Sequence, residues 1–269
     1  ENFSGLSYSD EENETLMRFG KVFQQTYTRF LDLQKAEAQA RESQIEASLE
    51  RVRSKAMAMQ SSNDLGLTVA TIFEELEKLN LETLRSGIGI INKEKKSADV
   101  WSTTKSEGGT AVQVSGDEPI AHPLLEGAYE AWLNQRDFSY LLEGKDLNEY
   151  YKSLTKTNFK LPDSESKVIE AEGLKQYYYV TAFPTGNLYA FRETEFPEEA
   201  KIVMKRFADV INFTYTRFND LKLSEAQAKE AQIELSLERV RAKTMAMHNS
   251  KDVGETVTVM FEELLNLGI

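Results

Sequence analysis

The sequence predicts an α+β fold in which an antiparallel-dominated sheet, flanked by helices, lies between two long helices. Short segments rich in β-branched and aromatic residues occupy the middle of the chain. A hairpin signal, Pro-Thr-Gly-Asn at 184–187, lies at the end of that region. After it, residues 198–248 contain neither proline nor glycine, and a closely similar stretch stands near the start of the chain. We therefore expect a sheet-containing domain with one long helix entering it and another leaving it.

The central region contains candidate strands separated by candidate helices. The strands share β-forming residues bounded by turn residues, and we place them at 86–92, 98–104, 110–114, 138–142, 175–183 and 188–191. The charged segment 92–97 is typical of the turn between the first two strands. Residues 123–134 and 145–157 are predicted helices on either side of the fourth strand. This order predicts one antiparallel sheet with helices on its faces.

Sequence signals mark both ends of the helix that leaves the domain. Pro197, followed by Glu198 and Glu199, is typical of a first helical turn, where a missing N–H costs little and negative charge suits the helix dipole. From there to His248 the helix would reach roughly 75 Å at about 1.5 Å per residue. Capping residues at 61–64 and 249–252 end each long helix and begin an amphipathic one.

The chain repeats part of itself at a constant offset of 188 residues, as between Phe30 and Phe218. Residues 37–59 read EAQARESQIEASLERVRSKAMAM, and residues 225–247 read EAQAKEAQIELSLERVRAKTMAM. We interpret the chain as a fragment of a tandem array, and duplication of the helix alone is the alternative. The expected divisions are the end of a preceding unit (1–33), a helical linker (34–60), a complete domain (61–221), a second linker (222–248) and the start of a following unit (249–269).

Composition argues against several classes of function. The net charge of −12 in 269 residues opposes binding to phosphate backbones and anionic lipid, so we expect no nucleic acid and no membrane contact. The sequence has no candidate membrane span or secretion signal, which predicts a cytoplasmic location. The absence of cysteine excludes a cofactor attached through a thioether. With two histidines in the chain, we expect no metal site and no catalytic residues, and any cofactor stays unidentified.

Both linkers carry apolar residues at alternating spacings of four and three, the pattern of a two-stranded coiled coil. The expected seam of a homodimer consists of Ile45, Leu49, Val52, Ala56, Met59, Ile233, Leu237, Val240, Thr244 and Met247. Upstream residues follow a different register, so the seam must shift between 34 and 44, where a helix could slide or rotate between two states. The alternative is that these faces pack on the chain's own domain.

Frequent aromatic residues in the central domain suggest an apolar pocket for a small-molecule ligand. The candidate lining residues are Trp101, Trp132, Tyr140, Tyr177 and Tyr179, with His122 or Arg136 as a polar anchor. These aromatics would otherwise form an ordinary core. Since successive strand residues point to opposite faces, at most alternate tyrosines of 177–179 can serve one site. The carboxylate pairs at 74–75 and 262–263 lie on helices, where we expect them to face solvent.

The element order, and the SLERVR-KxMAM sequence of both linkers, resembles the GAF family of sensory domains with signalling-helix linkers, as in bacterial sensor histidine kinases. The resemblance covers about 61–221. It implies a non-catalytic fragment of a larger two-component protein, in which a homodimer relays a conformational change through coiled-coil helices. The Asn-Lys-Phe-Asp-Glu signature of cyclic-nucleotide-binding members is absent, and so is the cysteine of bilin-binding members. The alternatives are an architectural dimerisation spacer without a ligand and a carboxylate-based enzyme.

Overall fold

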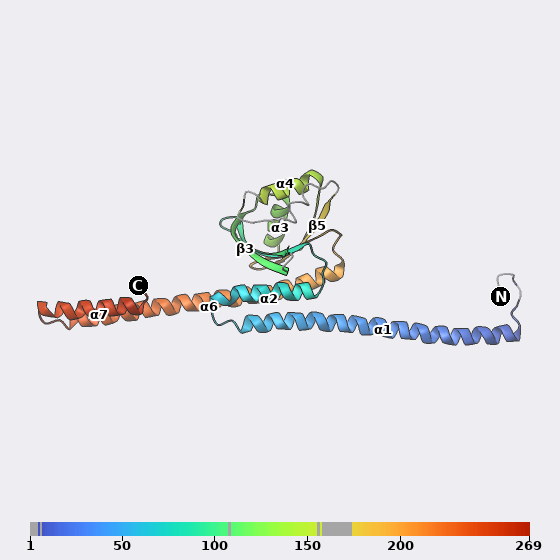
Figure 1. Ribbon diagram of the computed structural model, residues 1–269, viewed down its shortest axis with the longest axis horizontal. Helices are drawn as coiled ribbons and strands as arrows, with labels where there is room; N and C mark the ends of the chain where they lie inside the picture. The colour runs from blue at the N-terminus through green and yellow to red at the C-terminus, as the bar shows by residue number, and fades with distance from the viewer. Residues whose placement is uncertain (1–4, 6, 107–108, 155–156, 158–173) are drawn as a thin grey trace. The chain divides into compact units, whose positions relative to one another are not determined.

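The computed structural model describes the chain except for residues 1–4, 6, 107–108, 155–156 and 158–173 (Figure 1). It contains two compact units, Glu1–Glu50 and Arg51–Ile269. Most of the first unit belongs to helix α1 (Asp10–Met57), a single helix of 48 residues. A capping box starts this helix, because the Ser9 amide donates to Glu12 Oε2 at 2.7 Å and the Glu12 amide donates to Ser9 Oγ at 3.3 Å. The predicted long entry helix is thus confirmed.

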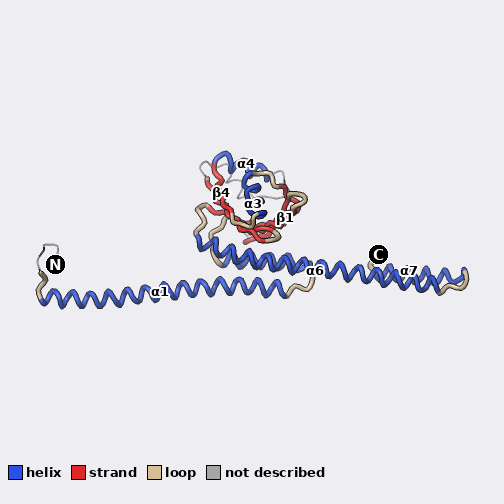
Figure 2. The backbone as a smooth tube through the Cα atoms, turned by 180° about the vertical axis from the view of Figure 1, so that it is seen from behind, coloured by secondary structure: helices blue, strands red, loops and turns tan. Residues whose placement is uncertain are grey.

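The second unit contains a six-stranded sheet in the order β3-β2-β1-β6-β5-β4. Figure 2 shows the strands in red. Its strands are β1 (Arg85–Asn92), β2 (Ser97–Ser106), β3 (Gly109–Pro119), β4 (Phe138–Glu143), β5 (Lys175–Phe183) and β6 (Gly186–Arg192). Every neighbouring pair is antiparallel. A two-residue turn at 184–185 joins β5 to β6, because Gly186 and Asn187 of the predicted turn already belong to β6. Strand β6 then pairs with β1, with Ile88 opposite Leu188. Each predicted strand is present, and the α+β class with its antiparallel sheet is confirmed.

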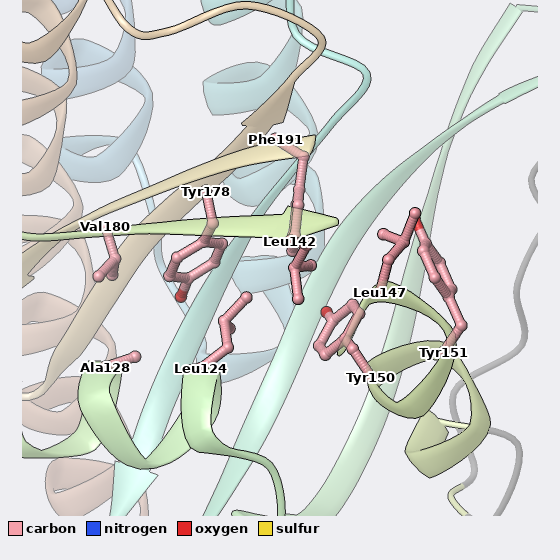
Figure 3. Packing of buried hydrophobic residues seen from close by; sticks show 9 residues of the cluster. All are labelled: Leu124, Ala128, Leu142, Leu147, Tyr150, Tyr151, Tyr178, Val180 and Phe191. Atoms are coloured by element: carbon pink, nitrogen blue, oxygen red, sulfur yellow. The ribbon is translucent and has the colours of Figure 1, made fainter. Parts of the chain in front are cut away.

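Two short helices, α3 (Pro123–Leu133) and α4 (Gly144–Leu154), cover one face of the sheet. Figure 3 shows their apolar side chains directed towards those of the strands. The core of this layer consists of Leu124, Ala128, Leu142, Leu147, Tyr150, Tyr151, Tyr178, Val180 and Phe191. Helix α3 begins at a buried cap, since the Leu124 amide donates to His122 Nδ1 at 3.2 Å. This core fixes both helices over strands β4 and β5.

Helices α2 (Leu65–Lys78) and α6 (Glu198–Met245) pack together and cover the opposite face. Because strand side chains alternate between faces, Ile88 of β1 lies on this side, where it lines a small cavity together with Ile72 and Ile211. Helix α6 is one helix of 48 residues that begins after Pro197, as predicted. The start of α2 is tied to the middle of α6, because the Ser62 amide and hydroxyl donate to Glu225 at 2.9 and 2.7 Å.

A tight turn follows each long helix and leads into a shorter helix, and after α6 that shorter helix packs against α6. The turns and the second short helix are η1 (Ser62–Asp64), η2 (Ser250–Asp252) and α7 (Val253–Asn266). In the first turn Asp64 Oδ2 accepts the amides of Gln60 and Ser61 at 2.9 and 3.1 Å. Asp252 makes the corresponding two bonds at 2.8 and 3.2 Å. The segments that repeat in sequence therefore form the same capped turn.

Candidate functional site

A pocket of about 100 Å³ lies between the sheet and helices α3 and α4. Strands β1, β2, β3, β5 and β6 contribute to its walls, and so do both helices. Its apolar and aromatic lining includes Ile91, Val100, Leu125, Ala128, Tyr129, Tyr150, Tyr178 and Tyr189. Sites for drug-sized ligands typically measure about 300–1,000 Å³. The pocket therefore has room for a very small molecule, or for one chemical group of a larger one.

Two glycines of β1 make room for side chains that reach the pocket. Gly87 and Gly89 alternate with Ile88, so they lie on the pocket face of the strand. A Cβ atom at Gly87 would overlap the ring of Tyr189, and one at Gly89 would lie 2.8 Å from Asn187 Oδ1. Both partners belong to the neighbouring strand β6 and line the pocket. The missing side chains thus let two large residues lie across β1.

Arg85, at the start of β1, places a buried positive charge in the pocket wall. The residue is 2% exposed, and its Nη2 donates to the Tyr150 hydroxyl at 3.0 Å. Its guanidinium carbon lies 4.4 Å from the ring centroid of Phe191, which is a cation–π distance. A guanidinium stays charged at all ordinary pH values and is weakly hydrated, which suits it to this surrounding. The positive charge favours ligands with an anionic or electron-rich group.

Tyr178 of β5 lies at the centre of the aromatic lining. Its ring centroid is 4.9 Å from that of Phe191 and 6.0 Å from that of Tyr189. Burial raises the pKa of the Tyr178 hydroxyl well above its ordinary value, and the phenols of Tyr150 and Tyr189 add to the rise, while Arg85 opposes it. Tyr178 therefore presents a neutral hydroxyl to the pocket throughout the physiological pH range.

Glu118, near the end of β3, brings a carboxylate to the same wall. The residue is 8% exposed, and its Oε1 has no hydrogen-bond partner among the described residues. A buried acceptor without a donor is unfavourable, because it has given up its bonds to water. A ligand that carries an N–H or O–H group would satisfy this oxygen. Glu118 and Arg85 thus give an otherwise apolar pocket two polar features of opposite charge.

His122 joins the two helices above the pocket. Its Nδ1 caps α3, and its Nε2 lies 3.5 Å from Asp146 Oδ1 in the first turn of α4. Its ring meets that of Tyr150 edge to face, with 5.3 Å between centroids. His122 does not line the pocket, so it differs from the polar anchor predicted from the sequence. It acts on the site by holding α3, α4 and the ring of Tyr150 together.

None of the seven residues predicted to line a pocket is among the described residues that line this one. Tyr177 and Tyr179 lie on the other face of β5 from Tyr178. The Tyr179 hydroxyl donates to Asp137 Oδ2 at 3.0 Å, and its ring centroid is 5.5 Å from that of Phe196. The prediction used the correct alternation of side chains along the strand, but it selected the face that turns away from α3 and α4.

The other predicted pocket residues are spread over the domain. Trp101 lines the small cavity on the face of the sheet that α2 and α6 cover. Trp132 Nε1 donates to the Pro184 carbonyl oxygen at 3.3 Å, at the rim of the domain. Arg136 is exposed after the end of α3. Tyr140 and Tyr177 line a separate cavity beside Phe196. An aromatic count cannot identify a pocket, because aromatic residues serve both faces of this sheet.

The predicted dimer seam differs between the two linkers. In the first linker all five predicted residues are buried within a single chain. In the second, Ile233, Val240 and Met247 are half-buried, whereas Leu237 and Thr244 are exposed. The second linker thus has exposed apolar surface in a single chain, whereas the predicted seam residues of the first linker are all buried.

An ion pair connects the end of each long helix to the short helix that follows it. Arg51 Nη2 lies 2.6 Å from Glu75 Oε2, and Arg239 Nη1 lies 3.1 Å from Glu263 Oε1. The Ser236 hydroxyl also donates to Glu263 Oε2 at 2.7 Å. This hydrogen bond, and then the bond and charge of Arg239, lower the pKa of Glu263. The two pairs occupy equivalent positions of the sequence repeat.

The burial of these two carboxylates corrects an expectation from the sequence. Glu75 and Glu263 were expected to face solvent, but they are 2% and 9% exposed. Glu75 lies three residues after Ile72 on α2, so helical periodicity places it on the buried face of that helix. The two adjacent glutamates suggested that both face solvent, but only the first member of each pair is exposed.

Neither a metal-binding cluster nor a membrane-spanning helix is found among the described residues. Within it, no three side chains of the types His, Cys, Asp and Glu are grouped so that they could hold a metal ion. No helix in the same ranges has both the length and the apolar character needed to cross a bilayer.

Comparison with known proteins gives no match in sequence. No family model matches the chain, and neither does any curated protein. Among solved structures, the chain is similar to the crystal structure of bacteriophytochrome RpBphP3 from the photosynthetic bacterium R. palustris, with 10% sequence identity and a TM-score of 0.44. The match covers 83% of this chain and 46% of that chain, so the match spans less than half of that protein's length.

Proposed function

We propose that this chain is a non-catalytic sensory segment of a larger signalling protein, and that a small molecule bound in the pocket alters its long helices. The supporting observation is that the same strands border the pocket on one face and helices α2 and α6 on the other. Along β6, Tyr189 lines the pocket, whereas Leu188 and Ala190 lie on the side of α2 and α6. Because protein interiors are close-packed, a displacement of β6 moves both layers.

The pocket favours a ligand with an apolar body and two polar groups. The anionic or electron-rich group would lie near Arg85, and a hydrogen-bond donor would lie near Glu118. A ligand that exceeds the present volume of about 100 Å³ has to displace α3, α4 or the strands beneath them. That displacement is the conformational change a sensor needs. We propose that the ligand binds by enlarging the pocket in this way.

The relay in this proposal runs through a parallel homodimer joined along the second linker. Leu237 is 44% exposed in a single chain, and it lies on the predicted seam. In the first linker the seam residues are already buried, so we assign the dimer contact to 233–247 alone. The output would be a histidine kinase of a cytoplasmic two-component protein, the context that the linker sequences indicate.

Thermal unfolding with candidate ligands tests the sensory function. Small carboxylates and other metabolites with an apolar body and an N–H or O–H donor would be screened against the full chain. A true ligand raises the melting temperature progressively with its concentration. At 100 times its Kd it stabilises the folded state by about 2.7 kcal/mol. Glu118→Gln should reduce that gain, whereas Glu126→Gln, at an exposed position on α3, should leave it unchanged. Equal gains in both variants would contradict the assignment of the pocket.

Disulfide trapping tests the dimer, and the absence of cysteine makes single-cysteine variants simple to interpret. In a parallel dimer in register, Ile233→Cys and Leu237→Cys should each form a covalent dimer under mild oxidation. Leu235→Cys is the matched control, because Leu235 is 55% exposed on the same helix but lies off the seam. An antiparallel pair would trap at most one of the two seam positions. A chain that sediments as a monomer at tens of micromolar would refute the dimer.

The small pocket volume favours one alternative, an architectural spacer without a ligand. In a spacer, the domain would fix the distance and the orientation of the helices, and the aromatic lining would serve as core. The spacer predicts that no ligand raises the melting temperature, and that a pocket-filling Ala128→Met variant is neutral or stabilising. A sensor predicts loss of ligand response in that variant.

A further inference from the structure

We infer that the exposed apolar face of α1 is a docking surface for an α+β domain of the same architecture as residues 65–192. We define the α1 face by Leu16, Phe19, Val22, Phe23 and Thr26. The first four side chains are 47–71% exposed, and they follow helical spacing on one side of α1. Contiguous exposed apolar surface of this kind marks an interaction site. We identify the domain that would bind this face from the part of the chain that covers the equivalent face of α6.

The repeat places a covered copy of the α1 face in the same chain. At the offset of 188 residues, the α1 face corresponds to Met204, Phe207, Val210, Ile211 and Thr214. These five residues are 0–3% exposed on α6, beneath the sheet and beside α2. The contrast is largest at Phe19, which is 71% exposed, while its counterpart Phe207 is 0% exposed. The same residue type on the same helix face is therefore bare in one copy and covered by an α+β domain in the other.

The side-chain chemistry of the two faces matches closely. Phe19, Val22 and Thr26 are identical to their counterparts, and Leu16 and Phe23 replace one apolar residue by another. The hydroxyls of Thr26 and Thr214 both donate to the carbonyl oxygen four residues earlier, at 2.9 and 2.8 Å. A small residue directly follows Phe19 and Phe207 in the two copies, Gly20 in α1 and Ala208 in α6. The α1 face can therefore accept the surface that covers α6.

A polar contact supports the same occupant further along the helix. Glu225 of α6 accepts two hydrogen bonds from Ser62, at the turn where α2 of the domain begins. Glu37 occupies the corresponding position of α1 within the identical sequence EAQA. A docked domain would therefore place the serine of its own first turn on Glu37. This contact distinguishes a domain with a capped α2-like helix from an unrelated apolar partner.

The match ends in the first turns of the helices, which limits the surface. Ala200 and Val203 are buried on α6, whereas Glu12 and Thr15 occupy these positions on α1. Glu12 Oε2 accepts the Ser9 amide in the capping box. The occupant therefore covers α1 from Leu16 onwards and leaves its first turn open to solvent.

The test is to fuse a copy of the α+β domain to the start of α1 in one chain. Residues 61–197 would be placed directly before residue 10, which reproduces the junction between residues 197 and 198. Amide hydrogen exchange at 16–26 should slow by at least about tenfold relative to the natural chain and approach the exchange of 204–214. Phe19→Glu in the extended chain is the control, and it should abolish the slowing. Exchange at 16–26 that is equally fast with and without the added domain would overturn the inference.

A second variant keeps the inference testable if the extended chain fails to fold. Met204→Leu, Ala208→Gly and Ile211→Phe together give α6 the apolar residues of the α1 face. We expect this variant to unfold in a single cooperative thermal transition, whereas Phe207→Glu should abolish the transition. Loss of cooperative unfolding in the triple variant would show that the α1 face does not fit such a domain.

The competing occupant is the α1 helix of a second chain. It predicts that the natural chain forms a concentration-dependent dimer, which Phe19→Glu dissociates in sedimentation equilibrium. That result would overturn the inference. A sedimentation equilibrium unchanged by Phe19→Glu, with slowed exchange in the extended chain, would support it.

Discussion

Arg239 on α6 lies 3.1 Å from Glu263 on α7, and it repeats the ion pair that Arg51 makes with Glu75 at the end of α1. Both carboxylates are buried although both arginines are mostly exposed. A buried carboxylate that loses its partner is unfavourable, so each pair selects one register of its helical hairpin. A long helix that slides by one residue would have to break this contact. The two ion pairs thus favour a defined register for the helices that they join.

Arg239→Ala should loosen the hairpin of α6 and α7 without unfolding the domain. The substitution leaves Glu263 with the Ser236 hydrogen bond alone, so amide exchange in α7 should become faster. Arg241→Ala is the matched control, because Arg241 is 59% exposed and pairs with Glu238 within one turn of the same helix. Equal acceleration in both variants would mean that the pair does not hold the hairpin.

Acid should open the same hairpin. The pKa of Glu263 is lowered in the folded chain from its ordinary value of 4.5. The unfolded state therefore binds the proton more readily, so the stabilisation is complete above about pH 4.5 and is lost as the pH falls through the folded value. NMR titration of the Glu263 side chain should give a midpoint below 4.5. Ser236→Ala and Arg239→Ala should each raise this midpoint, since the Ser236 bond is the largest cause of the lowered pKa and Arg239 adds a hydrogen bond and a positive charge.

Local sequence patterns predicted most of the fold, because each element has its own strong signals. The hairpin at 184–187 and the alternation along β5 and β6 fixed one half of the sheet. Pro197 and the acidic first turn marked the start of α6. The spacing of four and three in the linkers was ambiguous, because one apolar face can serve a coiled coil or a hairpin with the next helix. Only burial separates these, and it differs between the two copies.

The pocket was less predictable, because its position depends on which face of the sheet α3 and α4 cover. The informative signal was the alternation of Gly87 and Gly89 with Ile88 and Ile90 along β1, which marks a face where other side chains cross closely. Tyr178 then follows from the strand period once that face is known. The carboxylate of Glu118 gave no local signal, because its burial comes from tertiary packing.

Leu124→Ala should destabilise the domain by about 2–5 kcal/mol, the usual range for truncating a fully buried leucine. Leu124 is 0% exposed in the core between α3 and the sheet. Leu133→Ala serves as the control on the same helix, because Leu133 is 46% exposed and its loss should change stability by less than about 0.5 kcal/mol. Urea unfolding of the full chain measures both. A small effect at Leu124 would contradict the packing of α3 on the sheet.

Tyr178→Phe should make the protein more resistant to alkali. The pKa of Tyr178 is raised above the ordinary value of 10.0 by burial, so the folded state holds this proton more tightly than the unfolded state. Its contribution to stability is complete below about pH 10 and is lost as the pH rises towards the folded pKa. The decline of stability above pH 10, followed by urea unfolding, should therefore be shallower in the variant. Tyr27→Phe, at an exposed position of α1, should leave the slope unchanged.

Gly87→Ala and Gly89→Ala, two neighbouring substitutions on one face of β1, should differ in cost. At Gly87 the added Cβ would overlap the ring of Tyr189 and would lie 2.7 Å from the Trp101 carbonyl oxygen. A backbone atom cannot rotate away, so we expect a loss of about 1–3 kcal/mol, the range for overpacked sites. At Gly89 the contact is the tip of the Asn187 side chain at 2.8 Å, which can turn aside, and we expect less than about 1 kcal/mol. Urea unfolding gives both values, and a Gly89 variant as unstable as the Gly87 variant would show that Asn187 is held rigidly against β1.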